Sequence, residues 1–439
     1  MSQATKIGLI ITLAFVLGTC VAGGRTPHEL PRGHRYMRES RAAGKALQAG
    51  ELSAYRDAVI RLNQEFPENS RWLRNRAVIE ARLGDRAEAL RQVRTYASLG
   101  LTLDLKEPWL APLVEISKEV PELKENSEAI TEAEKLFSAP DSGLVIEDIA
   151  YDVQQKQYFL SSIRQRKILR CDSDGHCRDF VKSSSELPLG AVLALHADSL
   201  HSVLWATTAE MNAEADFKKE QDGQSSVLKL DLHSGRLLKR FEPGDGRKHA
   251  LGDMTVASNG DAYVCDGLSG DVFLISHADD RLKPLAPAGV FVSPQMPVLS
   301  ADEKLLYVPD YVGGIAALRL SDRHIEWLSS TRPVALEGID GMYLYKQCLI
   351  AIQNGTMPER ITAFHLVSPT RIDKFGVLEA NWRGLGDPTH GVVIGDQFYF
   401  IANSGWDRVA DDGQFTEGDA AQIMKRPLGR IASAPVRVH

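Results

Sequence analysis

The sequence predicts an all-β six-bladed β-propeller over residues 143–433, preceded by an all-α helical-repeat region over residues 36–137. Two observations lead to this fold class. After Gly143, runs of the form strand, turn, strand, turn, strand recur six times, at a period of about 40 to 60 residues. Before it, apolar residues follow helical periodicity, and Gly50-Glu51 recurs as Gly84-Asp85 at a spacing of 84 − 50 = 34 residues.

Length and composition fit a soluble globular protein of two domains. The chain has 439 residues, of which 44% are hydrophobic and 25% are charged, and a single ordinary core does not reach that size. The 51 basic and 58 acidic residues give a net charge of −7, with no basic stripe or lysine run. We therefore expect no nucleic acid partner.

Residues 1–22 resemble a secretory signal. A positive charge precedes a mostly apolar run from Ile7 to Val16, and small residues follow. Cleavage after Ala22 releases a soluble protein, whereas cleavage before Cys20 leaves a lipid anchor. Both routes predict an exported protein, periplasmic or extracellular, that touches the membrane only through an anchor at Cys20. No later apolar run approaches the ~18 residues of a membrane helix.

Four cysteines follow Cys20. Cys171 and Cys177 flank a turn-like stretch between two strand-like runs, and in an oxidising compartment they can pair across this hairpin. Cys265 and Cys348 lie in apolar strands, which favours buried free thiols. No cysteine or histidine pair stands at the spacing of a zinc site.

The 34-residue spacing before the propeller is the period of tetratricopeptide (TPR-like) repeats. Each repeat is expected to consist of two helices around a glycine turn, and Pro67 ends the first pair. A third, degenerate unit is expected over residues 104–137, with an apolar face of Trp109, Leu113, Ile116 and Val120. Because a repeat cannot bury its face alone, the region should lean on the propeller or on a protein partner. A plain helical spacer is the alternative.

The innermost strand of each propeller blade lines a central channel, and the residues before that strand rim one mouth. These positions hold Glu147-Asp148, Gly190-Ala191, Gly252-Asp253, Gln295-Met296, Asp340-Gly341 and His390. Converging carboxylate and amide oxygens suit a hard divalent cation such as Ca²⁺. Without a cation, crowded carboxylates raise one another's pKa, so a metal ion or a proton is expected. The strand that closes the last blade stays unassigned, because the sequence after residue 428 is irregular.

These blade starts resemble those of the family of gluconolactonases, senescence-marker proteins and luciferin-regenerating enzymes, which is related to paraoxonases and strictosidine synthases. The resemblance covers residues 143–430. Its best stretches are 147–152, 252–256, 293–295 with 298–302, and 340–342. It implies one divalent cation in the channel, held by a glutamate, asparagines and an aspartate, which polarises a lactone or ester carbonyl.

Position by position, the family's glutamate falls on Glu147 and its aspartate on Asp340. The asparagine of the fourth blade falls on Gln295, a longer amide that still offers an oxygen. The asparagine of the third blade falls on Gly252, which has no side chain, so this ligand is lost unless Asp253 turns inward. The expected metal ligands are therefore Glu147, Asp253, Gln295 and Asp340.

His390 and Asp253 are the candidate catalytic residues. The unperturbed pKa of histidine lies near neutrality, so His390 is expected to act as a general base for water, although a structural role is the common one for a lone histidine. His249 is a weaker candidate. Turn-forming roles are expected for Asp266, Asp310, Asn354 and Asn403. The insertion at residues 209–224 is either a lid or a solvated loop.

Two functions of different classes fit these observations. The first is an exported metal-dependent lactonase or esterase, a hydrolase of a small-molecule lactone or ester. The second is a non-catalytic binding protein that uses the repeats and the propeller surface for a protein, a peptide or a saccharide. The sequence contains no Gly-x-Ser-x-Gly elbow, no Walker loop and no His-Glu-x-x-His pattern, which disfavours serine hydrolases, nucleotide enzymes and zinc peptidases.

Overall fold

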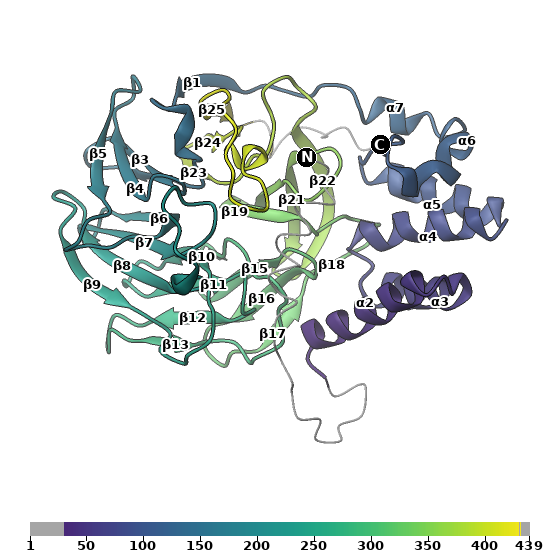
Figure 1. Ribbon diagram of the computed structural model, residues 1–439, viewed down its shortest axis with the longest axis horizontal. Coiled ribbons are helices and arrows are strands. Elements are labelled where there is room, and N and C mark those ends of the chain that lie inside the picture. Colours follow the sequence, from purple (N-terminus) through teal and green to yellow (C-terminus); the bar gives the residue numbers. More distant parts are fainter. Residues whose placement is uncertain (1–29, 430, 432–439) are drawn as a thin grey trace.

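The structure, a computed structural model, describes residues 30–429 and 431 (Figure 1). The signal-like segment 1–22, with Cys20, lies outside the described residues. Six sheets are arranged as the blades of a propeller, which confirms the predicted fold class, and a block of helices lies beside them. None of the described helices combines the length and the hydropathy needed to cross a membrane.

The first four blades are four-stranded sheets whose strands pair in chain order. The first blade contains β2 (Ile149–Asp152), β3 (Gln157–Ser162), β4 (Lys167–Cys171) and β5 (Cys177–Lys182), and the second contains β6 (Ala191–Asp198), β7 (Val203–Ala209), β8 (Ser225–Asp231) and β9 (Leu237–Phe241). The third blade contains β10 (Leu251–Val256), β11 (Ala262–Asp266), β12 (Val272–Ile275) and β13 (Leu282–Pro284). The fourth contains β14 (Val298–Leu299), β15 (Leu305–Asp310), β16 (Gly314–Arg319) and β17 (Ile325–Trp327).

The fifth blade consists of four strands in chain order, with one short strand added in parallel at the outer edge. They are β19 (Ile339–Tyr345), β20 (Cys348–Gln353), β21 (Arg360–Ser368), β22 (Arg371–Ala380) and the added β18 (Ser329–Ser330). Between blades, apolar side chains from facing sheets form the core, as where Phe159 of the first blade packs with Leu204 and Leu228 of the second. Strands buried on both faces are nearly continuous apolar runs, which is why the sequence reveals them.

The sixth blade is closed by a strand from the other end of the propeller. It contains β23 (Gly391–Ile394), β24 (Gln397–Ile401), β25 (Gln422–Pro427) and, outermost, β1 (Glu134–Ser138). Glu134 lies opposite Lys425 in the antiparallel pair. The expected end of the helical region at residue 137 therefore falls inside a propeller strand.

Four helices form the main part of the helical block, defined here as residues 32–125. They are α2 (Arg32–Gln48), α3 (Leu52–Glu65), α4 (Ser70–Arg82) and α5 (Arg86–Ser98). Gly50 and Gly84 stand at the turns with φ of 73° and 88°, a region that glycine enters without a steric penalty. The expected third unit contains only short helices, η2 (Pro108–Leu113), α6 (Val114–Ser117) and α7 (Glu122–Glu125). The assignment to tetratricopeptide repeats stays a prediction.

The helical block docks on loops of the fourth and fifth blades. The amide of Gly33 donates to the carbonyl of Val290 at 2.9 Å, and that of Thr102 to Met357 at 2.8 Å. Both propeller loops lie on the face where the inner strands begin, so the block stands beside the mouth that the sequence identified. This confirms that the helical region leans on the propeller.

The cysteines lie as the sequence suggested. Cys171 and Cys177 form a disulfide across the β4–β5 hairpin. Cys265 and Cys348 are buried free thiols in the second strands of their blades.

Candidate functional site

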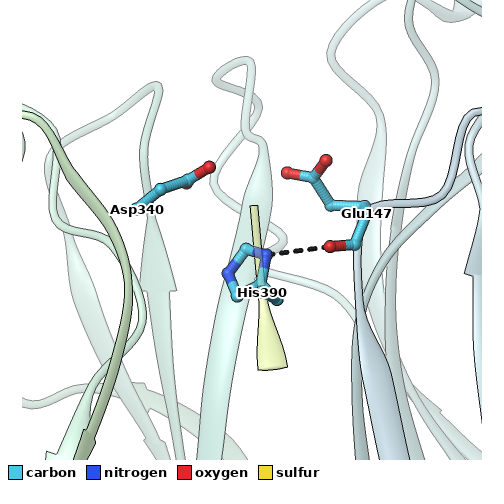
Figure 2. A group of neighbouring side chains, drawn as sticks. All are labelled: Glu147, Asp340 and His390. Atoms are coloured by element: carbon cyan, nitrogen blue, oxygen red, sulfur yellow. Dashed lines mark hydrogen bonds between the residues drawn. The ribbon is translucent and has the colours of Figure 1, made fainter. Parts of the chain in front are cut away.

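Three polar side chains from three blades meet at the channel mouth. Glu147 lies just before β2, Asp340 is the second residue of β19, and His390 comes just before β23. One potential ligand atom from each lies within 4.8 Å of the others. Figure 2 shows the two carboxylates turned toward one another beside the imidazole ring. The repeat of the blades explains the meeting, because every inner strand begins at the same mouth.

Each carboxylate is held through one of its oxygens. The Nε1 of Trp406 donates to Oε2 of Glu147. The Nδ2 of Asn354 donates to Oδ2 of Asp340 at 2.6 Å, and the hydroxyl of Tyr311 donates to Oδ1 of Asn354 at 3.0 Å. Among the described residues, no hydrogen-bond donor reaches the second oxygen of either carboxylate. Both carboxylates are thus fixed in orientation while one oxygen of each stays available.

The two carboxyl groups resist ionisation. Burial raises the pKa of Glu147 well above its ordinary value, and the nearby Asp340 raises it further. Burial raises the pKa of Asp340 to about 7, although the neighbouring His390 acts in the opposite direction. Glu147 keeps partial exposure to solvent, whereas Asp340 is buried. Two neighbouring carboxyl groups with raised pKa values favour the binding of a cation or of a proton between them.

His390 is a buried cation at this mouth, with 1% of its surface exposed. Its Nδ1 lies 3.1 Å from the backbone oxygen of Glu147, and its Nε2 lies 2.8 Å from Oδ1 of Asp253. Burial lowers its pKa, but the carboxylates of Asp253, Asp148 and Asp340 outweigh burial and raise the pKa well above the ordinary value. Nδ1 is therefore held by a hydrogen bond, whereas Nε2 lies within ion-pair distance of Asp253 but makes no hydrogen bond among the described residues.

The other two expected ligands point elsewhere. Asp253 is buried and turns inward, as expected of a residue that replaces the ligand missing at Gly252. It lies beside His390, however, and not beside the carboxylates of Glu147 and Asp340. Gln295 directs its amide nitrogen to the Oγ of Ser293 at 2.9 Å. The structure therefore brings together Glu147, Asp340 and His390, and it leaves Gln295 outside this group.

Several residues of the site could not be identified from the positions at which the inner strands begin. Asn354 has the sequence context of a turn residue, and Trp406 lies in the long loop between β24 and β25. Tyr343 accepts a hydrogen bond from the amide of Gly391 at 2.7 Å and so ties the fifth blade to the sixth. Asp148 accepts from the amide of Leu195 at 2.7 Å, which joins the first two blades, and burial raises its pKa to about 6. Only a three-dimensional arrangement identifies Asn354, Trp406 and Tyr343, whereas Asp148 stands at a blade start that the sequence already placed at the mouth.

The aspartates that end the second strands do form turns, as predicted. Oδ1 of Asp266 accepts from the backbone amides of Ala250, Leu268 and Ser269. Oδ1 of Asp310 accepts from the amides of Val312 and Gly313.

The insertion at residues 209–224 is packed against another loop. The Nδ2 of Asn212 donates to the backbone oxygen of Asp411 at 2.8 Å, and Met211 packs in one apolar cluster with Trp406 and Phe415. The insertion is thus part of a wall on the side of the mouth opposite the helical block. Through Trp406 this wall also orients Glu147.

No family model matches the chain, and no curated protein matches it. Solved structures similar to it include the PQQ-bound form of an aldose sugar dehydrogenase from Streptomyces coelicolor, with 12% identity over 68% of this chain and 98% of that one and a TM-score of 0.48. A gluconolactonase from Xanthomonas campestris shows 14% identity over 68% and 91% of the two chains, with a TM-score of 0.45. Luciferin-regenerating enzyme shows 14% identity over 69% and 96%, with a TM-score of 0.47.

Proposed function

We propose that Glu147 and Asp340 bind a divalent cation, calcium by the type of its ligands, and that the chain hydrolyses a small-molecule lactone or ester at this mouth. The observation that supports the proposal is the pair of facing carboxylates from the first and fifth blades, each with one oxygen available. Calcium takes carboxylate oxygens in loose geometry, so two ligands from separate blades fit it.

The residues present fit a cation that keeps exchangeable positions. Calcium takes about six to eight oxygen ligands. Since Asp253 faces His390 and Gln295 faces Ser293, the chain supplies fewer ligands than the resemblance implies. Water and the substrate would fill the remaining positions, as an open catalytic site requires.

The reaction joins a water oxygen to the carbonyl carbon, breaks the acyl C–O bond and moves a proton from water to the leaving oxygen. A bound cation would supply Lewis-acid polarisation of the carbonyl. Oε1 of Glu147 would be a ligand of this cation, because Trp406 occupies only Oε2. His390, with Nδ1 beside the backbone oxygen of Glu147 and Nε2 beside Asp253, acts as a positioning residue that holds the backbone of Glu147.

Thermal unfolding of residues 23–439 with added Ca²⁺ and then with chelator tests the cation site. We expect a calcium-dependent rise in Tm, since a site filled at about 100 times its Kd adds roughly 2.7 kcal/mol. The variants Glu147→Gln and Asp340→Asn should lose this rise. Glu186→Gln, an exposed carboxylate in the loop after the first blade, should keep it. Absence of any shift with divalent ions would overturn the proposed site.

A screen of simple lactones and esters tests the chemistry. We expect turnover with a kcat of about 1 per second or more that both variants lose. Calcium binding without turnover would favour the non-catalytic binding protein, an alternative that the missing side chain at Gly252 also favours. The signal-like N-terminus adds export to the proposal, and recovery of the chain only in the cytoplasmic fraction would contradict that part.

A further inference from the structure

Two arginines of α4 lie near the propeller without an acidic partner. Arg71 and Arg74 stand three residues apart in this helix, so they share one face. Both side chains are partly buried, and no described carboxylate oxygen lies within 4.0 Å of either guanidinium. The Nε of Arg74 is buried and has no hydrogen-bond partner among the described residues.

Several other arginines of the helical block have an acidic partner. The Nε of Arg56 lies 2.8 Å from Oε2 of Glu80, and a guanidinium nitrogen of Arg76 lies 2.7 Å from Oε1 of Glu88. Among the described residues of the block, Arg41, Arg82 and Arg94 also lack such a partner, but all three are exposed to solvent. Arg71 and Arg74 differ from them in that they are partly buried.

The start of α4 is fastened to the propeller, which fixes where the two arginines lie. The Nδ2 of Asn69 donates to the backbone oxygen of Val312 at 2.8 Å. The amide of Ser70 donates to Oε1 of Glu337 at 3.0 Å. Glu337 lies in the same interface, but its carboxylate accepts hydrogen bonds from Ser70 and forms no ion pair with a described arginine. α4 therefore begins at the interface between the helical block and the fourth and fifth blades (Figure 1), and Arg71 is its second residue.

Four tyrosines interact electrostatically with the two arginines: Tyr36, Tyr55 and Tyr311 with Arg71, and Tyr55 and Tyr96 with Arg74. Tyr311 already donates its hydroxyl to Asn354, and the other three are buried in apolar clusters. The two guanidinium groups are therefore the donors that remain for an anionic group, and a planar guanidinium binds a carboxylate or a phosphate through two bonds at once.

The energetics favour an anion in this place. Burial lowers the pKa of Arg71, and the like charge of Arg74 lowers it as well, although Tyr36 opposes this. Two cations held close together away from water are costly unless an anion accompanies them. The partial exposure of both side chains leaves a route for a solute from the surface.

One of these tyrosines connects the arginines to the channel mouth. The hydroxyl of Tyr311 donates to Asn354 at 3.0 Å, and Asn354 donates to Asp340 at 2.6 Å. The side chains of Tyr311 and Asn354 thus connect the surroundings of Arg71 to Asp340 at the mouth.

We propose that Arg71 and Arg74 form a binding site for the anionic group, a carboxylate or a phosphate, of a small ligand that approaches the channel mouth. This site goes beyond the proposed hydrolysis and needs no metal ion. It also gives the helical block a role in ligand recognition.

The test titrates residues 23–439 with inorganic phosphate and, separately, with succinate, in the presence of chelator and at an ionic strength held constant with chloride. We expect saturable binding by calorimetry of at least one anion, with a rise in Tm. Arg71→Gln and Arg74→Gln should each weaken the apparent Kd at least tenfold. Arg94→Gln, which removes an exposed arginine of α5, should leave binding unchanged.

Arg74→Gln gives a second readout without any anion. Removal of one of two like charges should leave the Tm of the free protein unchanged or raise it, whereas a purely structural arginine would lower it. Absence of saturable binding to wild-type protein would overturn the proposal, even if a variant failed to fold. Equal binding by the wild type and both variants would show only a general salt effect and would also overturn it. Because chelator is present, loss of the cation site does not affect the outcome.

Discussion

The buried imidazole of His249 lies between two carboxylates of the third-blade region. Its Nδ1 is 2.6 Å from Oδ2 of Asp266, and its Nε2 is 2.8 Å from Oδ1 of Asp245. Burial lowers the pKa of His249, but the two carboxylates outweigh burial and raise the pKa above its ordinary value. Because the folded-state pKa exceeds the unfolded value of about 6.5, the protonated ring stabilises the fold fully below that pH, and this is lost as pH rises through the folded-state pKa.

His249→Gln should therefore lower the free energy of unfolding by about 3 kcal/mol at pH 6, since it leaves two carboxylates without their cation. The difference from the wild type should be smaller at pH 9 than at pH 6, because a higher pH favours loss of the proton that the two carboxylates hold on the wild-type ring. Urea unfolding at both values measures this. His277→Gln, an exposed histidine beside Asp261, is the control and should change stability by less than about 1 kcal/mol. An equal difference at both pH values would contradict the argument.

Individual site residues differ in how far the sequence could identify them. Glu147, Asp340 and His390 could be placed at one mouth, because the blade repeat fixes where each inner strand begins. Asn354 and Trp406 could not, since they lie in loops whose direction no repeat specifies. The pairing of His390 with Asp253 depends on the orientation of two side chains across the channel.

At the scale of secondary-structure elements, β1 closes the propeller. It pairs with β25 from the far end of the chain, and Phe137 of β1 packs edge-on to Tyr158 at 5.8 Å between ring centroids. Only 6% of the surface of Phe137 is exposed. Local spacing revealed the other blades because their strands follow one another in sequence. It could not assign β1, whose partner strand lies nearly the whole propeller away.

Phe137→Ala should lower the free energy of unfolding by about 3 to 5 kcal/mol, because it leaves a cavity between the closing strand and the first blade. Glu134→Ala, on the exposed part of the same strand, should change it by less than about 0.5 kcal/mol. Guanidinium unfolding followed by tryptophan fluorescence measures both. If Phe137→Ala were as mild as its control, β1 would not hold the ring closed.

At the scale of the whole molecule, the helical block and the propeller form one folded unit. The sequence predicted that the helices need a surface to lean on, because two hairpins bury too little of their own. It could not indicate which blades supply the surface, since the contacts come from isolated loop residues. Leu73 and Tyr96 of the helices share an apolar cluster with Ala335 of the propeller. The helices thereby stand at the mouth instead of away from it.

Arg360 of β21 connects the propeller to the helical block, so its substitution tests whether the two parts unfold together. Its side chain is fully buried, its Nε donates to Oε1 of Gln353 at 2.9 Å, and one terminal nitrogen donates to the backbone oxygen of Leu99 at 2.7 Å, beyond the end of α5. Burial lowers the pKa of Arg360 to about 10, so the group stays charged at neutral pH. It therefore stabilises the carbonyl end of a helix with a full positive charge.

Arg360→Met should lower the free energy of unfolding by about 3 kcal/mol, because a buried carbonyl and a buried amide lose their donor. The loss should fall on the helical block. We therefore expect one calorimetric transition for the wild type, and for Arg360→Met an earlier helical transition followed by a later propeller transition. Circular dichroism at a helix-sensitive wavelength identifies the earlier one. Arg319→Met, a half-exposed arginine paired with Asp322, is the matched control and should unfold like the wild type. A single, unshifted transition in Arg360→Met would mean that the block holds to the propeller by its apolar contacts alone.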